Sequence, residues 1–226
     1  MNLPIIISLG GSLIVPEEID IAFLEGFKEI ILREVQAGKR FVIITGGGKI
    51  CRKYQDAARA LGDLSSSDLD WLGIHSTRFN AEFTKILFGE LAEEKIIIDP
   101  MSFSGFEKPI LLGAGYKPGF STDWDAVEIA KRSGAKKIIN LSNIDFVYES
   151  DPRKNPNAKK FEKISWADYI ALIPKDWDPG LNSPFDPVAS RDARDAGIEV
   201  AIMNGKNLEN FEAYLSGNSF TGTVIS

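Results

Sequence analysis

Residues 41–54 read Phe41-Val42-Ile43-Ile44-Thr45-Gly46-Gly47-Gly48-Lys49-Ile50-Cys51-Arg52-Lys53-Tyr54, an apolar run that ends in three glycines and continues into a basic helical pattern. Short apolar, β-branched runs are typical of buried strands, and glycines let the backbone approach a ligand closely. The amides of such a turn and of the helix after it point donors at an anion, to which Lys49 and Arg52 add positive charge. The stretch therefore predicts a phosphate site. The alternative is a glycine turn that only lets the helix pack on the sheet.

A second strand-to-glycine junction lies near the N-terminus. Residues 5–9 form an apolar run, and Gly10, Gly11 and Ser12 follow it. Between the two junctions, residues 20–38 place apolar side chains at helical spacing and end at a glycine. A strand, a helix and a strand in this order favour a parallel pair, in which both glycine turns lie at the carboxyl ends of neighbouring strands.

The rest of the chain continues the alternation of strands and helices. Helices are expected at residues 49–61, 68–87, 123–134, 165–172, 186–196 and 208–215, and short strands at 95–98, 109–112, 137–141, 199–203 and 223–225. Residues 174–184, which include Trp177, Pro179 and Gly180, have no period and are expected to form a surface loop. The pattern predicts an α/β fold in one domain over residues 1–226, with a largely parallel sheet sandwiched by helices.

The composition excludes several classes of protein. The chain has 226 residues and a net charge of −6 with a pI near 5.0, so it lacks the diffuse basic field expected for binding nucleic acid or an anionic membrane. No apolar run approaches the roughly 20 residues of a membrane span, and the N-terminus opens into a strand without the layout of a signal peptide. We therefore expect a cytoplasmic protein.

The single cysteine and the single histidine carry little chemistry in this sequence. Cys51 excludes an intramolecular disulfide and a multi-cysteine metal site. Its place before Arg52 in a first helical turn can lower the pKa of its thiol, yet a packing role is favoured. For His75 a structural role on its helix is favoured over a catalytic one, because the sequence offers it no metal or triad partners. No metal-binding residues are assigned.

Five motifs occur in an order and at separations that resemble the amino-acid-kinase superfamily. They are Gly10-Gly11-Ser12; Gly46-Gly47-Gly48-Lys49 with Arg52; Asp70 ahead of Gly73-Ile74 and Thr77-Arg78; Pro118-Gly119 with Ser121-Thr122-Asp123; and Asn143-Ile144-Asp145 before Tyr148 and Asp151-Pro152. Each is weak alone, but together they cover nearly the whole chain. Within the superfamily the chain resembles the archaeal-type UMP kinases. The Rossmann and Walker A fingerprints of other nucleotide-binding folds are absent from the sequence.

This resemblance implies a three-layer α/β/α domain that binds two nucleotides. The N-terminal half, about residues 1–120, would bind the phosphate acceptor, and the C-terminal half, about residues 121–226, would bind ATP. The implied reaction transfers the γ-phosphoryl group of ATP, with Mg²⁺, to UMP and yields ADP and UDP. The resemblance also implies a homohexamer.

The resemblance assigns residues to the acceptor site, the ATP site and the reaction centre. Those implied to bind UMP are Gly47, Asp70, Arg78, Tyr116, Lys117, Pro118, Gly119, Phe120, Ser121 and Thr122. Those implied to contact the phosphates of ATP are Gly10, Gly11, Ser12, Gly48 and Arg52. Those implied to line its adenine and ribose site are Ser142, Asn143, Tyr148 and Asp151. The catalytic residues would be Lys49, Arg52 and Asp123, because phosphoryl transfer requires in-line positioning and charge neutralisation.

Two of these assignments keep an alternative. Asp123 resembles the family aspartate that orients cationic groups, and it can also cap the helix that it begins. Arg78 suits either the phosphate of UMP or an ion pair across an oligomer interface. No general base is needed, because a phosphate oxygen of UMP is already ionised at pH 7.

Several residues depart from the family pattern. Ser8 stands where many members have a lysine. Phe146 replaces a glycine and would fill part of the ATP site or force a different turn, while Trp124 and Asp125 replace small residues. These departures leave two other functions open. One is a kinase of another small phosphate or carboxylate, and the other is a non-catalytic protein that binds a nucleotide or an oxyanion.

Overall fold

The structure is a computed structural model that describes residues 3–176 and 183–226. Its central sheet has seven strands in the order β3-β2-β1-β4-β8-β9-β7. These strands are β1 (Ile5–Leu9), β2 (Phe41–Thr45), β3 (Ile110–Gly113), β4 (Lys137–Ser142), β7 (Lys163–Ile164), β8 (Glu199–Asn204) and β9 (Thr223–Ile225). Neighbouring strands are parallel except β8 and β9, which are antiparallel. The predicted α/β fold with a largely parallel sheet is thus confirmed.

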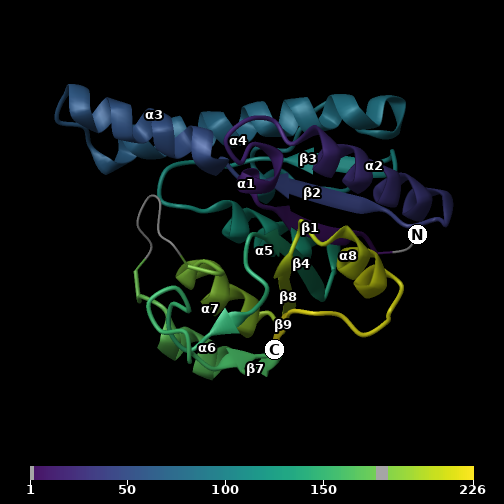
Figure 1. The fold of residues 1–226 in the computed structure, drawn as a ribbon. Helices are drawn as coiled ribbons and strands as arrows, with labels where there is room; N and C mark the ends of the chain where they lie inside the picture. Colours follow the sequence, from purple (N-terminus) through teal and green to yellow (C-terminus); the bar gives the residue numbers. More distant parts are fainter. Residues whose placement is uncertain (1–2, 177–182) are drawn as a thin grey trace.

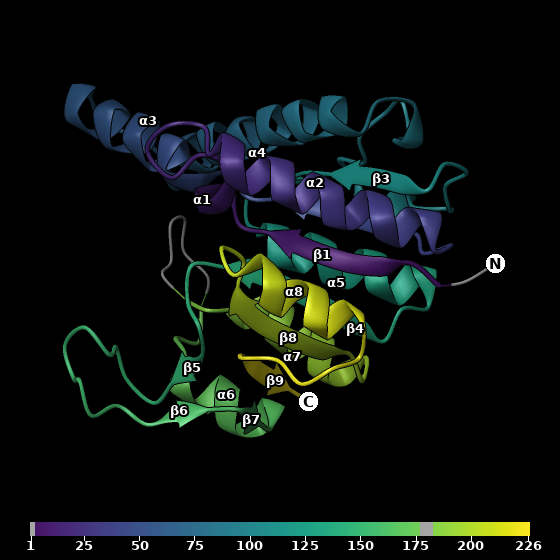
Figure 2. The ribbon, with the colours of Figure 1, turned by 45° about the vertical axis from the view of Figure 1, so that its right-hand side comes forward.

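Helices cover both faces of the sheet (Figure 1). On one face lie α1 (Gly11–Ile14), α2 (Ile21–Gln36), α4 (Ser66–Phe88) and α8 (Leu208–Leu215), with α3 (Gly48–Leu61) packed on α4. On the other lie α5 (Thr122–Ser133), α6 (Trp166–Leu172) and α7 (Pro187–Asp195). Figure 2 shows α2 and α8 in front of the sheet and α5 and α7 behind it. The connections hold η1 (Gly89–Leu91), η2 (Pro100–Ser102) and a hairpin of β5 (Val147–Tyr148) and β6 (Lys160–Phe161).

The sheet separates two hydrophobic cores. Side chains alternate along a strand, so Ile6 and Val42 pack under α5, α6 and α7, whereas Ile7 and Ile43 pack under α2, α4 and α8. All four are fully buried. Burial on both faces explains why β1 and β2 are almost continuously apolar, as the strands of parallel sheets usually are.

The helix starts follow the capping residues of the sequence. Ser65 and Asp68 form a capping box at α4, and Asp20 and Ser165 cap α2 and α6. Ser121 caps α5, because its hydroxyl accepts a hydrogen bond from the Trp124 amide at 3.2 Å. The alternative role of Asp123 as the cap of this helix is therefore wrong.

Two expectations about the elements need correction or qualification. Residues 95–98 do not form a strand, since only Ile97 of this segment makes an isolated bridge to β3 and the outer residues Lys95 and Ile98 are exposed. The sequence pattern missed α1, because a helix of four residues that begins with a glycine has no readable period. Within the predicted loop at 174–184, Trp177, Pro179 and Gly180 lie outside the described residues.

None of the described helices is long and apolar enough to cross a membrane.

Candidate active site

The two glycine turns lie against each other at the carboxyl ends of β1 and β2, as expected for neighbouring parallel strands. A Cβ atom on Gly11 would collide with the Gly46 carbonyl and the Gly48 amide, and one on Gly48 would collide with the Gly11 carbonyl. Gly48 also has φ +73°, which favours glycine. Asn80 of α4 donates a hydrogen bond from Nδ2 to the Gly46 carbonyl at 2.8 Å and fixes the second turn. The two turns therefore form one surface of backbone atoms that no side chain covers.

A cluster of polar side chains lies next to this surface, with Asp123 at its centre. Asp123 Oδ1 accepts hydrogen bonds from Ser8 Oγ of β1 at 3.0 Å and from Asn140 Nδ2 of β4 at 3.4 Å. Its Oδ2 accepts from the backbone amide of Asp186 at 3.2 Å. Asp186 itself caps α7 by accepting from the Ala189 amide, while its Oδ2 is buried without a hydrogen-bond partner among the described residues. The first turn of α5 and the start of α7 thus meet over β1 and β4.

The carboxyl groups of this cluster have raised pKa values. Burial of the Asp123 carboxyl group, followed by the nearby charge of Asp186, raises the pKa of Asp123 from 3.8 to about 7, although hydrogen bonds from Ser8 and the Asp186 amide oppose the shift. Burial also raises the pKa of Asp186. An enclosed pair of carboxyl groups favours a positive charge in the space that it faces.

Asp125, one of the departures from the family pattern, is buried in the same first turn of α5 as Asp123. Neither of its carboxyl oxygens has a hydrogen-bond partner among the residues described, and burial raises its pKa well above the ordinary value. The neighbouring Tyr116 amide and the charge of Arg78 oppose that shift. Burial therefore disfavours the charged form of Asp125 next to the segment between β3 and α5.

The segment Tyr116–Thr122 between β3 and α5 is held by α4. Arg78 donates hydrogen bonds to the carbonyl oxygens of Gly115 and Tyr116, at 3.3 and 2.8 Å. Asp70 Oδ2 accepts from the Gly119 amide at 2.9 Å, and Thr77 Oγ1 accepts from the Gly115 amide at 2.8 Å. Asp70, Arg78 and this segment, all implied to bind UMP, are thus brought together. The contacts of Arg78 are with loop carbonyls of its own chain.

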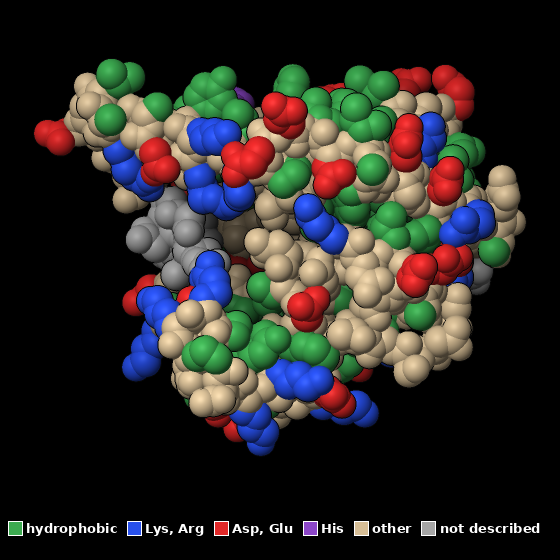
Figure 3. Space-filling model, viewed as in Figure 1, with side chains coloured by type: hydrophobic (Ala, Val, Ile, Leu, Met, Phe, Trp, Pro, Cys, Tyr) green, Lys and Arg blue, Asp and Glu red, His purple; other side chains and the backbone are tan. Residues whose placement is uncertain are grey.

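Lys49 and Arg52 begin α3 but differ in their contacts. Lys49 Nζ lies 2.6 Å from Glu17 Oε1, and Glu17 also pairs with Lys53 at 3.1 Å. Arg52 is exposed and makes no ion pair within the described ranges. Figure 3 shows Lys and Arg side chains gathered around a hollow of the surface beneath α3. Arg52 is therefore the more available of the two cations.

The residues implied to bind the adenosine of ATP also meet in one place. A pocket of about 620 Å³ follows the carboxyl end of β4, and its walls include Ser142, Asn143, Tyr148 and Asp151. Arg153 binds both oxygens of Asp151, at 3.0 and 2.9 Å, and lowers the pKa of that carboxyl group. The pocket is large enough for a nucleoside.

Phe146 is part of the wall of this pocket. Its ring lies edge-on to Tyr148, with centroids 6.4 Å apart, and Lys160 Nζ lies 4.2 Å from its centre. The ring therefore forms part of the pocket wall, between Tyr148 and Lys160.

Cys51 and His75 have the structural surroundings that were favoured for them. Burial raises the pKa of the Cys51 thiol, with only partial opposition from Arg52. His75 is exposed on α4 beside Trp71, with ring centroids 5.9 Å apart.

Sequence reasoning missed several residues that build the site. Asn140 interrupts an otherwise apolar strand, and Asp186 precedes a proline at a helix start. Both signals were readable, since a polar residue inside a buried strand needs a partner. Glu17 and Arg153 lie in loops, where their partners depend on the tertiary fold and leave no pattern in the sequence.

The geometry agrees with comparisons to known proteins. The chain matches the amino acid kinase family over residues 4–204. A protein of Methanospirillum hungatei named uridylate kinase is 31% identical over 98% of this chain and 94% of the relative. The uridylate kinase of Thermoplasma acidophilum is 32% identical over 100% and 97% of the two chains. The crystal structure of uridylate kinase from Archaeoglobus fulgidus has a TM-score of 0.83 and 28% identity, and the match covers 99% of this chain and 100% of that one.

Because the family match extends over most of its length, this protein belongs to the amino acid kinase family. Within that family it is similar, along nearly the whole chain, to archaeal proteins named uridylate kinase. The three-layer architecture expected from the motifs is that of these relatives.

Proposed function

We propose that this protein is a nucleoside monophosphate kinase that transfers the γ-phosphoryl group of ATP to UMP and yields ADP and UDP. The observation that carries the proposal is the contact of two bare glycine turns beside Asp123, because such a surface accepts two phosphate groups side by side. The names of the archaeal relatives support UMP as the acceptor.

The two nucleotides are proposed to bind at opposite ends of the surface that the two glycine turns form. UMP would lie in the N-terminal half, residues 1–120, between Gly47, Asp70 and the segment Tyr116–Thr122. ATP would lie in the C-terminal half, residues 121–226, with its adenosine in the pocket after β4. Its phosphates would extend toward Gly10, Gly11, Ser12 and Gly48. The two halves form one domain in this proposal, because β1 and β4 pair directly at the centre of the sheet.

A small set of side chains would neutralise the charge of the phosphate groups. Arg52 would approach the transferring phosphoryl group from α3, and Lys49 would join it on leaving Glu17. Asp123 would orient cations from its position between Ser8, Asn140 and the Asp186 amide. No side chain has to remove a proton from UMP, because its phosphate is an anion at neutral pH.

Mg²⁺ is the proposed cofactor of ATP, and the carboxyl cluster fits it. Asp123 makes no ion pair with the described residues, and Asp186 Oδ2 is buried without a hydrogen-bond partner among them. Carboxylate and amide oxygens are the donors that Mg²⁺ prefers, so Asp123, Asp186 and Asn140 would hold it directly or through water. When bound, the ion neutralises phosphate charge.

The cellular setting is also part of the proposal. UMP phosphorylation belongs to pyrimidine nucleotide synthesis, and we place the protein in the cytoplasm as a homohexamer. Exposed apolar side chains on α3 and α4 support self-association, since a partner subunit could cover them. They are Tyr54, Leu61, Trp71, Phe79 and Ile86.

A panel of acceptors tests the function. The purified protein is incubated with ATP, Mg²⁺ and, separately, UMP, CMP, AMP, GMP, carbamate or isopentenyl phosphate, and ADP formation is measured. We expect UMP to give the highest kcat/KM. Faster turnover of another acceptor would replace UMP as the substrate. Tight ATP binding by calorimetry without turnover of any acceptor would indicate a non-catalytic protein.

A further inference from the structure

An aromatic cluster lies on the segment that is proposed to hold UMP. The rings of Tyr116 and Phe120 both rest on Trp124 of α5, with centroids 6.3 and 4.2 Å from that of the indole. The Tyr116 and Trp124 rings are nearly parallel, at 12°. Lys117 places its ammonium group 4.8 Å from the centre of the Tyr116 ring. Two aromatic residues of the segment are thus joined through one side chain of α5.

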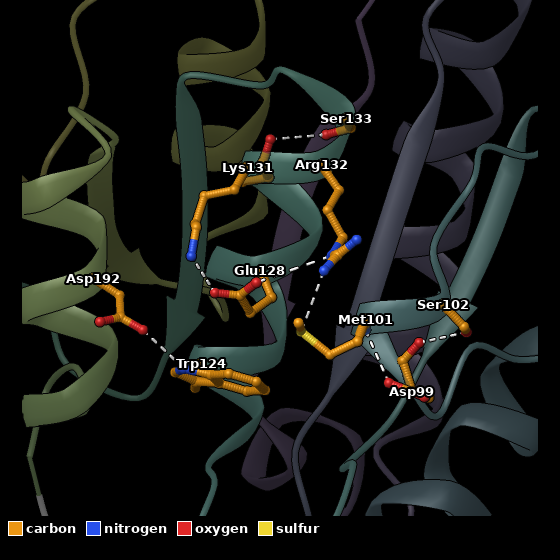
Figure 4. A network of polar contacts seen from close by, with 10 residues as sticks. Asp99, Met101, Ser102, Trp124, Glu128, Lys131, Arg132, Ser133 and Asp192 are labelled. Atoms are coloured by element: carbon orange, nitrogen blue, oxygen red, sulfur yellow. Dashed lines mark hydrogen bonds and ion pairs between the residues drawn. The ribbon is translucent and has the colours of Figure 1, made fainter.

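Trp124 is itself fixed from the opposite side. Only 8% of its surface is exposed, and its indole N–H donates a hydrogen bond to Asp192 Oδ2 of α7 at 2.9 Å. Figure 4 shows the indole of Trp124 beneath α5, with Asp192 reaching it from α7. A ring held by packing and by a hydrogen bond to a charged group has little freedom to move, so it can support the rings that pack on it.

Trp124 is adjacent in sequence to Asp123, in the same first turn of α5. The turn that directs Asp123 toward Ser8 and Asn140 therefore also fixes the position of the Trp124 ring, on which the other two aromatic rings pack. A displacement of Trp124 would move residues 116–122, here called the acceptor segment, relative to the reaction centre. Small displacements of this kind can cost a large factor in rate.

We propose that Trp124 is a positioning residue that holds the acceptor segment in its binding conformation before UMP arrives. The inference rests on the proposed function. A segment that is already ordered loses less conformational entropy when the ligand binds, so the benefit appears in the affinity for the acceptor. Trp124 acts through Tyr116 and Phe120, and none of these three residues lines the pocket proposed for ATP.

Trp166 provides a matched control. It is also buried, at 5% exposure, and its indole N–H also donates to an oxygen, the Ile198 carbonyl at 3.0 Å, but it lies in α6 away from the acceptor segment. The test compares Trp124→Leu with Trp166→Leu by steady-state kinetics and thermal unfolding. We expect both variants to lose stability. Only Trp124→Leu should raise KM for UMP, by about tenfold or more, with KM for ATP within about twofold of the wild type.

Two milder variants keep the test decisive if Trp124→Leu does not fold. Trp124→Phe keeps a ring under the segment but loses the donor, and Asp192→Ala removes the acceptor of that hydrogen bond. We expect each to raise KM for UMP by about two- to tenfold, the range for one lost hydrogen bond. Equal KM values for UMP in all Trp124 and Asp192 variants and in the wild type would overturn the inference. Absence of UMP turnover in the wild type would instead overturn the proposed function.

Discussion

At the scale of single residues, Asp123 combines a functional position with an unfavourable charge. Folding raises its pKa from 3.8 to about 7, so the folded protein binds this proton more tightly than the unfolded chain does. The free energy of unfolding contributed by Asp123 is therefore greatest below about pH 4 and is lost as the pH rises toward 7. Ionisation of Asp123 therefore lowers the stability of the unliganded protein.

The first prediction concerns this charge. Asp123→Asn removes the titrating group, so the Tm of the unliganded variant relative to the wild type should increase between pH 4.5 and pH 7.5, and kcat should fall by about 100-fold or more. Thermal unfolding across this pH range and steady-state kinetics measure the two effects. A Tm difference that does not change with pH would contradict the raised pKa.

The second prediction concerns Arg52. Arg52→Ala should lower kcat by about 100-fold or more, because the lost cation acts on charge in the transition state. The free energy of unfolding should change by no more than about 0.5 kcal/mol, since the side chain is exposed. Arg59→Ala is the control, because Arg59 is an exposed cation of the same helix that pairs with Asp56. If kcat is the same in both variants, the role of Arg52 is wrong.

The sequence alone predicted only some of the residues of the candidate active site. The glycines of both turns and Asp123 were found because their motifs are local, whereas Asn140 and Asp186 reach Asp123 from distant parts of the chain. Lys49 shows what a local motif leaves out. The resemblance implied a catalytic charge at this residue, and the structure adds an ion pair with Glu17, which no local pattern connects to it.

At the scale of elements, α4 holds the acceptor segment in place through the hydrogen bonds of Arg78 and Asp70. Arg78→Lys keeps the charge but loses the planar fork that reaches two carbonyl oxygens. We expect faster amide hydrogen exchange in residues 115–120 and a rise of about tenfold in KM for UMP, with KM for ATP unchanged. Hydrogen exchange followed by mass spectrometry and steady-state kinetics check both effects. Unchanged exchange in this segment would show that other contacts hold it.

Element boundaries were predictable where the signal was local. The helix caps at Asp20, Ser65 and Ser165 were readable from the residues themselves. The apolar run at 95–98 predicted a strand, but a strand also requires a continuous partner edge, and that requirement is set by the tertiary fold. The short strands β5, β6 and β7, of two residues each, carry no readable period.

At the scale of the whole molecule, the order of strands determines where the nucleotides can meet. The neighbours β2, β1 and β4 lie side by side, and each is followed at its carboxyl end by a glycine turn or by the pocket proposed for ATP. The alternation of strands and helices predicted this sheet, because parallel strands with crossover helices leave few arrangements. The family resemblance supplied the substrate assignment, which no periodicity contains.

The assembly prediction belongs to this scale. We expect light scattering to give a mass of six times the 24.9 kDa chain. Phe79→Glu should reduce that mass, because it places a charge on a side chain that is 77% exposed in the single chain and apolar. A wild-type mass of one chain at micromolar concentration would contradict the hexamer, and the active site would then have to function in the monomer.

We propose that the surface formed by the two glycine turns brings the γ-phosphoryl group of ATP to the phosphate of UMP. Following the phosphorus atom tests this transfer. ATP labelled at the γ-phosphate is mixed with UMP, Mg²⁺ and the protein, and the products are separated. The label should appear at the β-phosphate of UDP, and this transfer should be lost in Arg52→Ala. Label found only in inorganic phosphate, or only in ATP, would contradict the account.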